Sequence, residues 1–191
     1  SVELIDKIGF EAFTFKKLGQ LINSPEASVY RYFESKHKLL LYLASWFWGW
    51  MEYRLVFDLA NVRSPEERLE RAIHTLTSMM TNEDEKSFIQ KARLHRIVIS
   101  ESSKAYLTKE VDLENKDGVF SGYKQLVARV SGIIHEINPD YRYPHMLIST
   151  VIEGSLHQRY FAEHLPRLTD VVEGEDAVTS FYTELVFKAI S

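Results

Sequence analysis

The sequence predicts an all-α protein, with a three-helix N-terminal unit followed by a larger helical body. Three observations support this fold class. Nearly every segment of the 191 residues repeats its apolar side chains at helical spacing, and no alternating strand pattern persists. Apolar residues make up 45% of the chain, as in folded globular proteins. A break at "NSP", residues 23–25, separates two short apolar-periodic segments near the start.

Composition limits the function classes. The chain has no cysteine, which excludes disulfides and thiolate metal sites and is compatible with a reducing compartment. The net charge of −4 argues against nucleic acid along the whole surface but leaves a local basic patch open. No run approaches the roughly 20 apolar residues of a membrane span, and no signal peptide is visible. We therefore expect a cytoplasmic protein without a membrane partner.

Three short helices are expected first. The opening segment, "SVELIDKI", begins in mid-helix, so this helix is expected to be incomplete; it ends at Gly9. The second helix begins at Thr14, and the third runs over about residues 26–33. Their apolar faces consist of Val2, Ile5 and Ile8, then Phe15, Leu18 and Ile22, then Val29 and Phe33.

The body is expected to begin with a long helix over about residues 36–60. Its predicted apolar face is Leu39, Tyr42 or Leu43, Trp46, Trp50, Tyr53 and Phe57. The sequence "SPEE" at residues 64–67 starts the next helix, because Ser64 caps it, Pro65 fits its first turn and Glu67 completes a capping box. Further helices are expected from Asn82 or Asp84, and over about 119–137, 145–164 and 177–190, with a loop at "ENKDG".

The unit around "NSP" has the features of a helix-turn-helix. Gly19 follows the core residue Leu18 at a place where a larger side chain would block the next helix. Asn23 tolerates the left-handed conformation that the turn needs. Ser24 is expected to cap the following helix, with Pro25 at its first position.

In such a unit the second helix enters the major groove of DNA. Ala27 and Ser28 are small enough for close approach, and Tyr30, Arg31 and Tyr32 have the length to contact phosphates or base edges. Residues 14–38 carry five lysines and arginines, Lys36 included, against two glutamates, a local net charge of +3. The alternative is a helical hairpin whose lysines are merely solvated.

The stretch "GFEAFTFKKLGQLINSPEASVYRYFESKHKLL" resembles the N-terminal domain of the TetR family of transcriptional regulators. Its most specific part is "VYRYFESKHKLL", with a Tyr-x-x-Phe followed by Ser-Lys and Leu. The resemblance implies an all-α homodimer whose variable C-terminal domain senses a small molecule. It also implies DNA contacts at Thr14, Lys17, Ser24, Ala27, Ser28, Tyr30, Tyr32 and Lys36.

The stretch departs from the family pattern at three positions. Asn23 replaces the usual turn glycine, and Pro25 occupies a position often held by a capping serine. Glu26 stands where a basic residue is common, and an anion there repels phosphate. We expect weaker affinity or an unusual operator. The predicted domains are residues 1–40 for DNA binding and residues 41–191 for ligand binding and dimerisation.

An apolar or aromatic small molecule is the expected ligand of the body. The predicted ligand residues are Trp46, Trp50, Tyr53, Met80, Phe88, Tyr123 and His157. The alternative for the aromatic residues of the long helix is ordinary core packing.

The last two helices are the predicted dimer seam, with Gly154 permitting close approach. Their predicted faces are Ile148, Ile152, Ser155 and Arg159, and Val178, Phe181, Tyr182 and Leu185. The alternative is that these residues complete the core of a monomer.

An enzyme is not expected. Seven histidines invite a search for metal or catalytic sites, but Glu34 to His37 is the one Glu-x-x-His pair. No His-Glu-x-x-His, phosphate loop or Gly-x-Ser-x-Gly occurs. We therefore expect no catalytic residue, cofactor or metal. The sequence favours a ligand-responsive regulator, more often a repressor, that binds a palindromic operator. The alternative is a helical binding or carrier protein with a purely structural helix-turn-helix.

Overall fold

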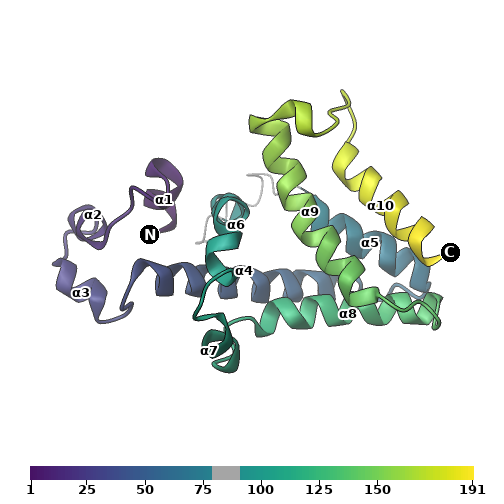
Figure 1. Ribbon diagram of the computed structural model, residues 1–191, viewed down its shortest axis with the longest axis horizontal. Coiled ribbons are helices and arrows are strands. Elements are labelled where there is room, and N and C mark those ends of the chain that lie inside the picture. Colours follow the sequence, from purple (N-terminus) through teal and green to yellow (C-terminus); the bar gives the residue numbers. More distant parts are fainter. Residues whose placement is uncertain (79–90) are drawn as a thin grey trace. The chain divides into compact units, whose positions relative to one another are not determined.

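The computed structural model describes residues 1–78 and 91–191, and every regular element in these ranges is a helix (Figure 1). The all-α prediction is therefore confirmed. Within the same ranges, no helix is both long and apolar enough to cross a membrane. The predicted helix starts at Asn82 or Asp84 and the apolar residue Met80 lie outside the described residues.

The chain forms two compact units, which divide the long helix α4 (Lys36–Asp58) after Phe47. The first unit also contains α1 (Val2–Ile8), α2 (Phe15–Leu21), α3 (Glu26–Tyr30), α6 (Lys91–Tyr106) and α7 (Val111–Lys116). The second contains α5 (Pro65–Thr77), α8 (Ser121–Ile137) from Gly122 onward, α9 (Pro144–His164), η2 (Pro166–Leu168) and α10 (Ala177–Ile190). The functional boundary at residue 40 stays a prediction.

Two capping residues, Thr14 and Ser64, begin helices where the sequence predicts them. Ser64 Oγ accepts a hydrogen bond from the backbone N–H of Glu67 at 3.2 Å, with Pro65 in the first turn of α5. Thr14 caps α2 in the same way. Because each side chain satisfies a backbone donor that has no partner within the helix, these starts are fixed locally.

One predicted loop is partly helical. The "ENKDG" segment was expected to be irregular, but its first three residues form the end of α7. Glu114 lies in this part of α7 and is completely buried. Local composition did not reveal this tertiary burial, and the prediction was wrong.

The predicted apolar face of α4 was wrong in part. Leu39 and Leu43 are buried as predicted, but Tyr42, Tyr53 and Phe57 are 57%, 60% and 65% exposed. The buried residues that the prediction missed include Leu40, Phe47, Met51 and Leu55. Apolar residues occur all round this helix, so spacing alone did not select a side. A tyrosine that stays exposed keeps its hydroxyl in water, which favours the exposure of Tyr42 and Tyr53.

In the second unit, α9 packs against α5 and α10, and α10 also packs against α5 (Figure 1). Ile148, Ile152 and Ser155 of α9 are no more than 1% exposed. Tyr182 of α10 is buried as well, with its hydroxyl against Gly154. These members of the predicted dimer faces therefore complete the core of their own unit. Phe181 and Leu185 of α10 remain exposed.

A polar network joins α5, α9 and α10 inside this unit. Arg159 donates to the carbonyl oxygen of Thr77 at 2.8 and 3.0 Å and to the Asp176 carboxylate at 2.6 and 2.7 Å. Asp176 caps α10 by accepting from the Thr179 backbone at 3.1 Å. Burial alone would raise the pKa of Asp176, but the hydrogen bonds from Arg159 and Thr179 hold this pKa below its usual value. The Arg159 guanidinium is thus engaged in hydrogen bonds within the unit, although Arg159 was predicted to lie on the dimer seam.

Candidate nucleic-acid interface

The turn between α2 and α3 depends on a close approach at Gly19. A Cβ atom on Gly19 would lie 2.5 Å from the carbonyl oxygen of Ser24 and 3.3 Å from the backbone nitrogen of Glu26. The Ser24 N–H donates to the Gly19 carbonyl at 2.8 Å, which closes the turn. Asn23 has a positive φ of 53°, as its replacement of a turn glycine predicts. The backbone at the start of α3 therefore packs directly against α2 at Gly19.

The capping prediction at Ser24 was wrong. Pro25 is the N-cap of α3, and it makes no side-chain cap bond. The helical hydrogen bonds begin with the Ser28 N–H, which donates to the Pro25 carbonyl at 2.9 Å. Ser24 lies one residue earlier, where its own N–H is needed for the turn.

Helix α3 and the two residues that follow it carry several exposed side chains. Val29 is its buried residue, which fastens it to the unit. Tyr32 is 82% exposed, Ala27 and Arg31 are exposed, and Ser28 is half-buried. Tyr30 is 51% exposed and also packs edge-to-face on Phe15, with ring centroids 4.9 Å apart. We call α3 the recognition helix, because its side chains are free to meet an outside surface.

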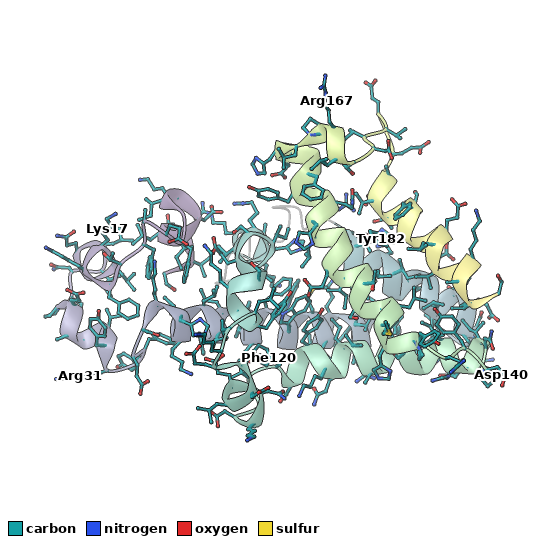
Figure 2. All side chains as sticks on the ribbon, in the orientation of Figure 1. Lys17, Arg31, Phe120, Asp140, Arg167 and Tyr182 are labelled. Atoms are coloured by element: carbon teal, nitrogen blue, oxygen red, sulfur yellow. The ribbon has the colours of Figure 1, made fainter. Side chains whose placement is uncertain are left out.

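Two lysines among the predicted DNA contacts already donate hydrogen bonds to backbone carbonyl oxygens. Lys17 Nζ donates to Ala12 at 2.7 Å. Lys36 Nζ donates to Phe10 and Glu11 at 3.3 Å each, and it lies 5.0 Å from the centroid of the Phe10 ring. An ammonium group has three donors, so each lysine keeps at least one for a phosphate. Figure 2 shows Lys17 and Arg31 at the outer edge of the first unit.

The acidic residues near the start of the chain are paired with α6. Arg96 holds Asp6 through two hydrogen bonds of 3.0 Å, and Arg93 lies 3.4 Å from the same carboxylate. Lys104 binds Glu11, and this hydrogen bond lowers the pKa of Glu11 and raises that of Lys104. These anions are therefore neutralised within the unit, which leaves Lys16 and Lys17 of α2 and Arg31 after α3 to contribute positive charge near the recognition helix. Sequence periodicity gave no sign of this pairing.

The predicted ligand residues that the structure describes belong to both units. Trp46 belongs to the first unit and is half-buried, as is Trp50 in the second unit; Tyr53 is exposed. Met80 and Phe88 lie outside the described residues. Ligand binding at these positions stays a prediction.

Tyr123 and His157 are linked through one residue of α9. The Tyr123 hydroxyl donates to Glu153 Oε1 at 2.7 Å, and its ring stacks on Trp48 at 4.4 Å. His157 Nδ1 lies 2.8 Å from the Glu153 carbonyl oxygen. This pair is the part of the predicted ligand set that the structure brings together.

The second unit has an open groove that the sequence did not indicate. Its volume is about 630 Å³, and it lies between the end of α4 and α5, with Phe57, Arg71 and His74 in its walls. Among the residues that the structure describes, no group of three or more His, Asp or Glu side chains has a geometry suited to a metal ion.

Comparison with known proteins gives one match to a family and one to a solved structure. Residues 1–43 match the family model described as "Bacterial regulatory proteins, tetR family". The solved structure "Crystal structure of superantigen PfiT" matches with a TM-score of 0.58 at 16% identity, over 98% of this chain and 90% of that chain. At this identity the likeness shows the fold alone. No curated protein matches the chain.

Proposed function

We propose that this protein, whose N-terminal domain is that of the TetR family of DNA-binding regulators, is a ligand-responsive repressor that binds a palindromic operator as a homodimer. The observation that carries the proposal is the exposed recognition helix, held against α2 at Gly19 and lying within the matched segment. The proposal locates the protein in the cytoplasm and assigns it no catalytic activity.

The proposed interface uses two kinds of contact. Ala27, Ser28 and Tyr32 meet base edges, because small side chains in α3 and an exposed side chain just after it allow the helix to enter the major groove. The phosphate contacts are proposed for Thr14, Lys17, Ser24, Tyr30, Arg31 and Lys36. Glu26, in the first turn of α3, weakens binding to the backbone by repulsion.

Regulation is proposed as a coupled equilibrium. A small apolar or aromatic ligand binds a conformation of the body in which the two recognition helices of the dimer lose their groove spacing of roughly 34 Å. Thermodynamic linkage then requires the operator to weaken ligand binding by the factor by which ligand weakens operator binding. Equal ligand affinities with and without operator would reject this coupling.

Selection from a random-sequence duplex pool tests the DNA-binding proposal. We expect enrichment of palindromic sequences, with affinity that falls steeply as salt rises. Ser28→Ala is expected to change the preferred sequence, because a hydroxyl facing a base edge would be lost. Ser180→Ala, an exposed serine of α10, is the matched control and leaves the preference unchanged. A protein that enriches no sequence and shows no salt-dependent affinity would be a carrier protein instead.

A further inference from the structure

Glu114 of α7 is a buried carboxylate that reaches the start of α4. The residue has no exposed surface. Its Oε1 accepts from His37 Nε2 and from Lys38 Nζ, each at 3.0 Å. Its Oε2 is buried too, with no hydrogen-bond partner among the described residues. A carboxylate is stable in such a place only where cations compensate its lost hydration. The hydrogen bonds to Glu114 therefore hold the side chains of His37 and Lys38 in place.

Both partners of Glu114 lie in the first turn of α4, the helix that follows the recognition helix along the chain. Ser35 caps this turn by accepting from the Lys38 backbone N–H at 3.2 Å. On the other side of Ser35, the N–H groups of Tyr32 and Phe33 donate to the Val29 carbonyl at 3.0 and 3.1 Å. Glu34 lies between these two hydrogen-bonded segments, Val29–Phe33 and Ser35–Lys38. Because this connection is short, we expect a shift of the first turn of α4 to displace the end of α3.

We infer that Glu114 is a positioning residue for DNA binding: by holding His37 and Lys38, it fixes the first turn of α4 and, through that turn, the recognition helix. This inference rests on the proposed function and adds a residue of the α6–α7 segment to it. It also gives Lys38 a role distinct from that of Lys36. The Lys38 ammonium is bound to a buried carboxylate, whereas Lys36 holds two carbonyl oxygens.

The test compares Glu114→Gln, which keeps the side-chain shape and removes its charge, with Asp112→Asn. Asp112 is an exposed residue of the same helix, so this control makes the same change in net charge. Affinity is measured by fluorescence anisotropy on a duplex recovered from the random-sequence pool. We expect Glu114→Gln to weaken binding by between about 2-fold and about 30-fold, the range of residues that act through others, and the control to have little effect.

Lys38→Gln and the double variant separate positioning from direct contact. We expect Lys38→Gln to weaken binding without changing the salt dependence, because no phosphate contact is lost. In the double variant the two losses are expected to be less than additive, since both remove the same ion pair. The salt slope is the steepness with which the logarithm of affinity falls against the logarithm of salt concentration. If this slope is smaller by about 0.9 in Lys38→Gln, then Lys38 contacts a phosphate and the inference is overturned. If Glu114→Gln fails to fold, the salt dependence of DNA binding by Lys38→Gln alone tests the inference.

Amide hydrogen exchange over residues 26–35 gives a readout that does not require DNA. We expect faster exchange in Glu114→Gln than in Asp112→Asn over this range, with unchanged exchange in α2. Equal exchange together with equal affinity in the two variants would overturn the inference. If the wild-type protein binds no duplex, the proposed function fails. Hydrogen exchange then still decides whether Glu114 positions α3.

Discussion

At the scale of the residue, Gly19 determines whether α2 and α3 can meet. The space for a Cβ atom there is filled by backbone, which cannot rotate away as a flexible side chain can. Gly132 of α8 is the opposite case, because nothing lies within 4 Å of the Cβ position. The two residues give a matched pair for testing the turn.

Gly19→Ala is expected to destabilise the protein by about 1–3 kcal/mol, because the added methyl group must displace the Ser24 carbonyl. It should also weaken DNA binding, since α3 shifts with that carbonyl. Gly132→Ala is expected to stabilise by up to about 1 kcal/mol, because alanine favours a helix and meets no obstacle. Urea unfolding of both variants measures the difference. Equal effects of the two substitutions would contradict the close approach at Gly19.

Lys36→Ala is expected to weaken binding to every duplex sequence. A lysine that donates to two carbonyls keeps one donor for a phosphate, so the salt slope should fall by about 0.9. Affinities at several salt concentrations measure this slope. An unchanged slope would instead assign Lys36 solely to holding the carbonyls of Phe10 and Glu11.

At the scale of the element, the start of a helix can be predicted from its capping residue, whereas the side of a helix that is buried cannot always be predicted from the sequence. Thr14 and Ser64 each begin a helix at the residue that the local sequence predicts. The orientation of α4 was not predictable in this way, because almost every position from Leu39 to Met51 is apolar. Its buried face was set by the helices that pack against it.

Asp176→Asn tests the polar network at the start of α10. The pKa of Asp176 is below its ordinary value of 3.8, so its charge stabilises the fold above that pH, and this contribution is lost as the pH falls through the lowered pKa. The variant should therefore be less stable than wild type at pH 7 but equally stable below the lowered pKa. Because 40% of the Asp176 side chain is exposed, solvent screening keeps the difference to no more than about 1 kcal/mol.

Urea unfolding of wild type and Asp176→Asn across this pH range measures the effect. Asp170→Asn, an exposed residue of the α9–α10 connection, is the control for net charge. A difference that stays the same at all pH values would show that the charge of Asp176 contributes nothing.

At the scale of the whole molecule, the distribution of charge and of exposed apolar residues matters more than their totals. The chain has a net charge of −4, yet Asp6 and Glu11 are neutralised by α6. A negative protein can in this way present positive charge near the recognition helix. The proposed dimer must likewise use residues that the core of the second unit leaves exposed, such as Phe181 and Leu185.

Phe181→Asp is expected to convert the proposed dimer to a monomer, because a charge at an apolar seam is costly when unpaired. Operator affinity should fall with it, since a palindrome requires two recognition helices. Sedimentation equilibrium measures the change. Leu107→Asp, at an exposed residue of the first unit, is the control and should remain dimeric. A dimer that survives Phe181→Asp would place the seam elsewhere.

The sequence by itself determined the all-α fold, the helix starts at Thr14 and Ser64, and the helix-turn-helix, because these depend on helical periodicity, local caps and backbone conformations. Gly19, Asn23 and Val29 were read correctly for this reason. The tertiary structure alone decided that Ile148 and Ile152 are internal, which side of α4 is buried, and that His37 meets Glu114. Those outcomes depend on contacts between residues far apart in the chain, which no local pattern records.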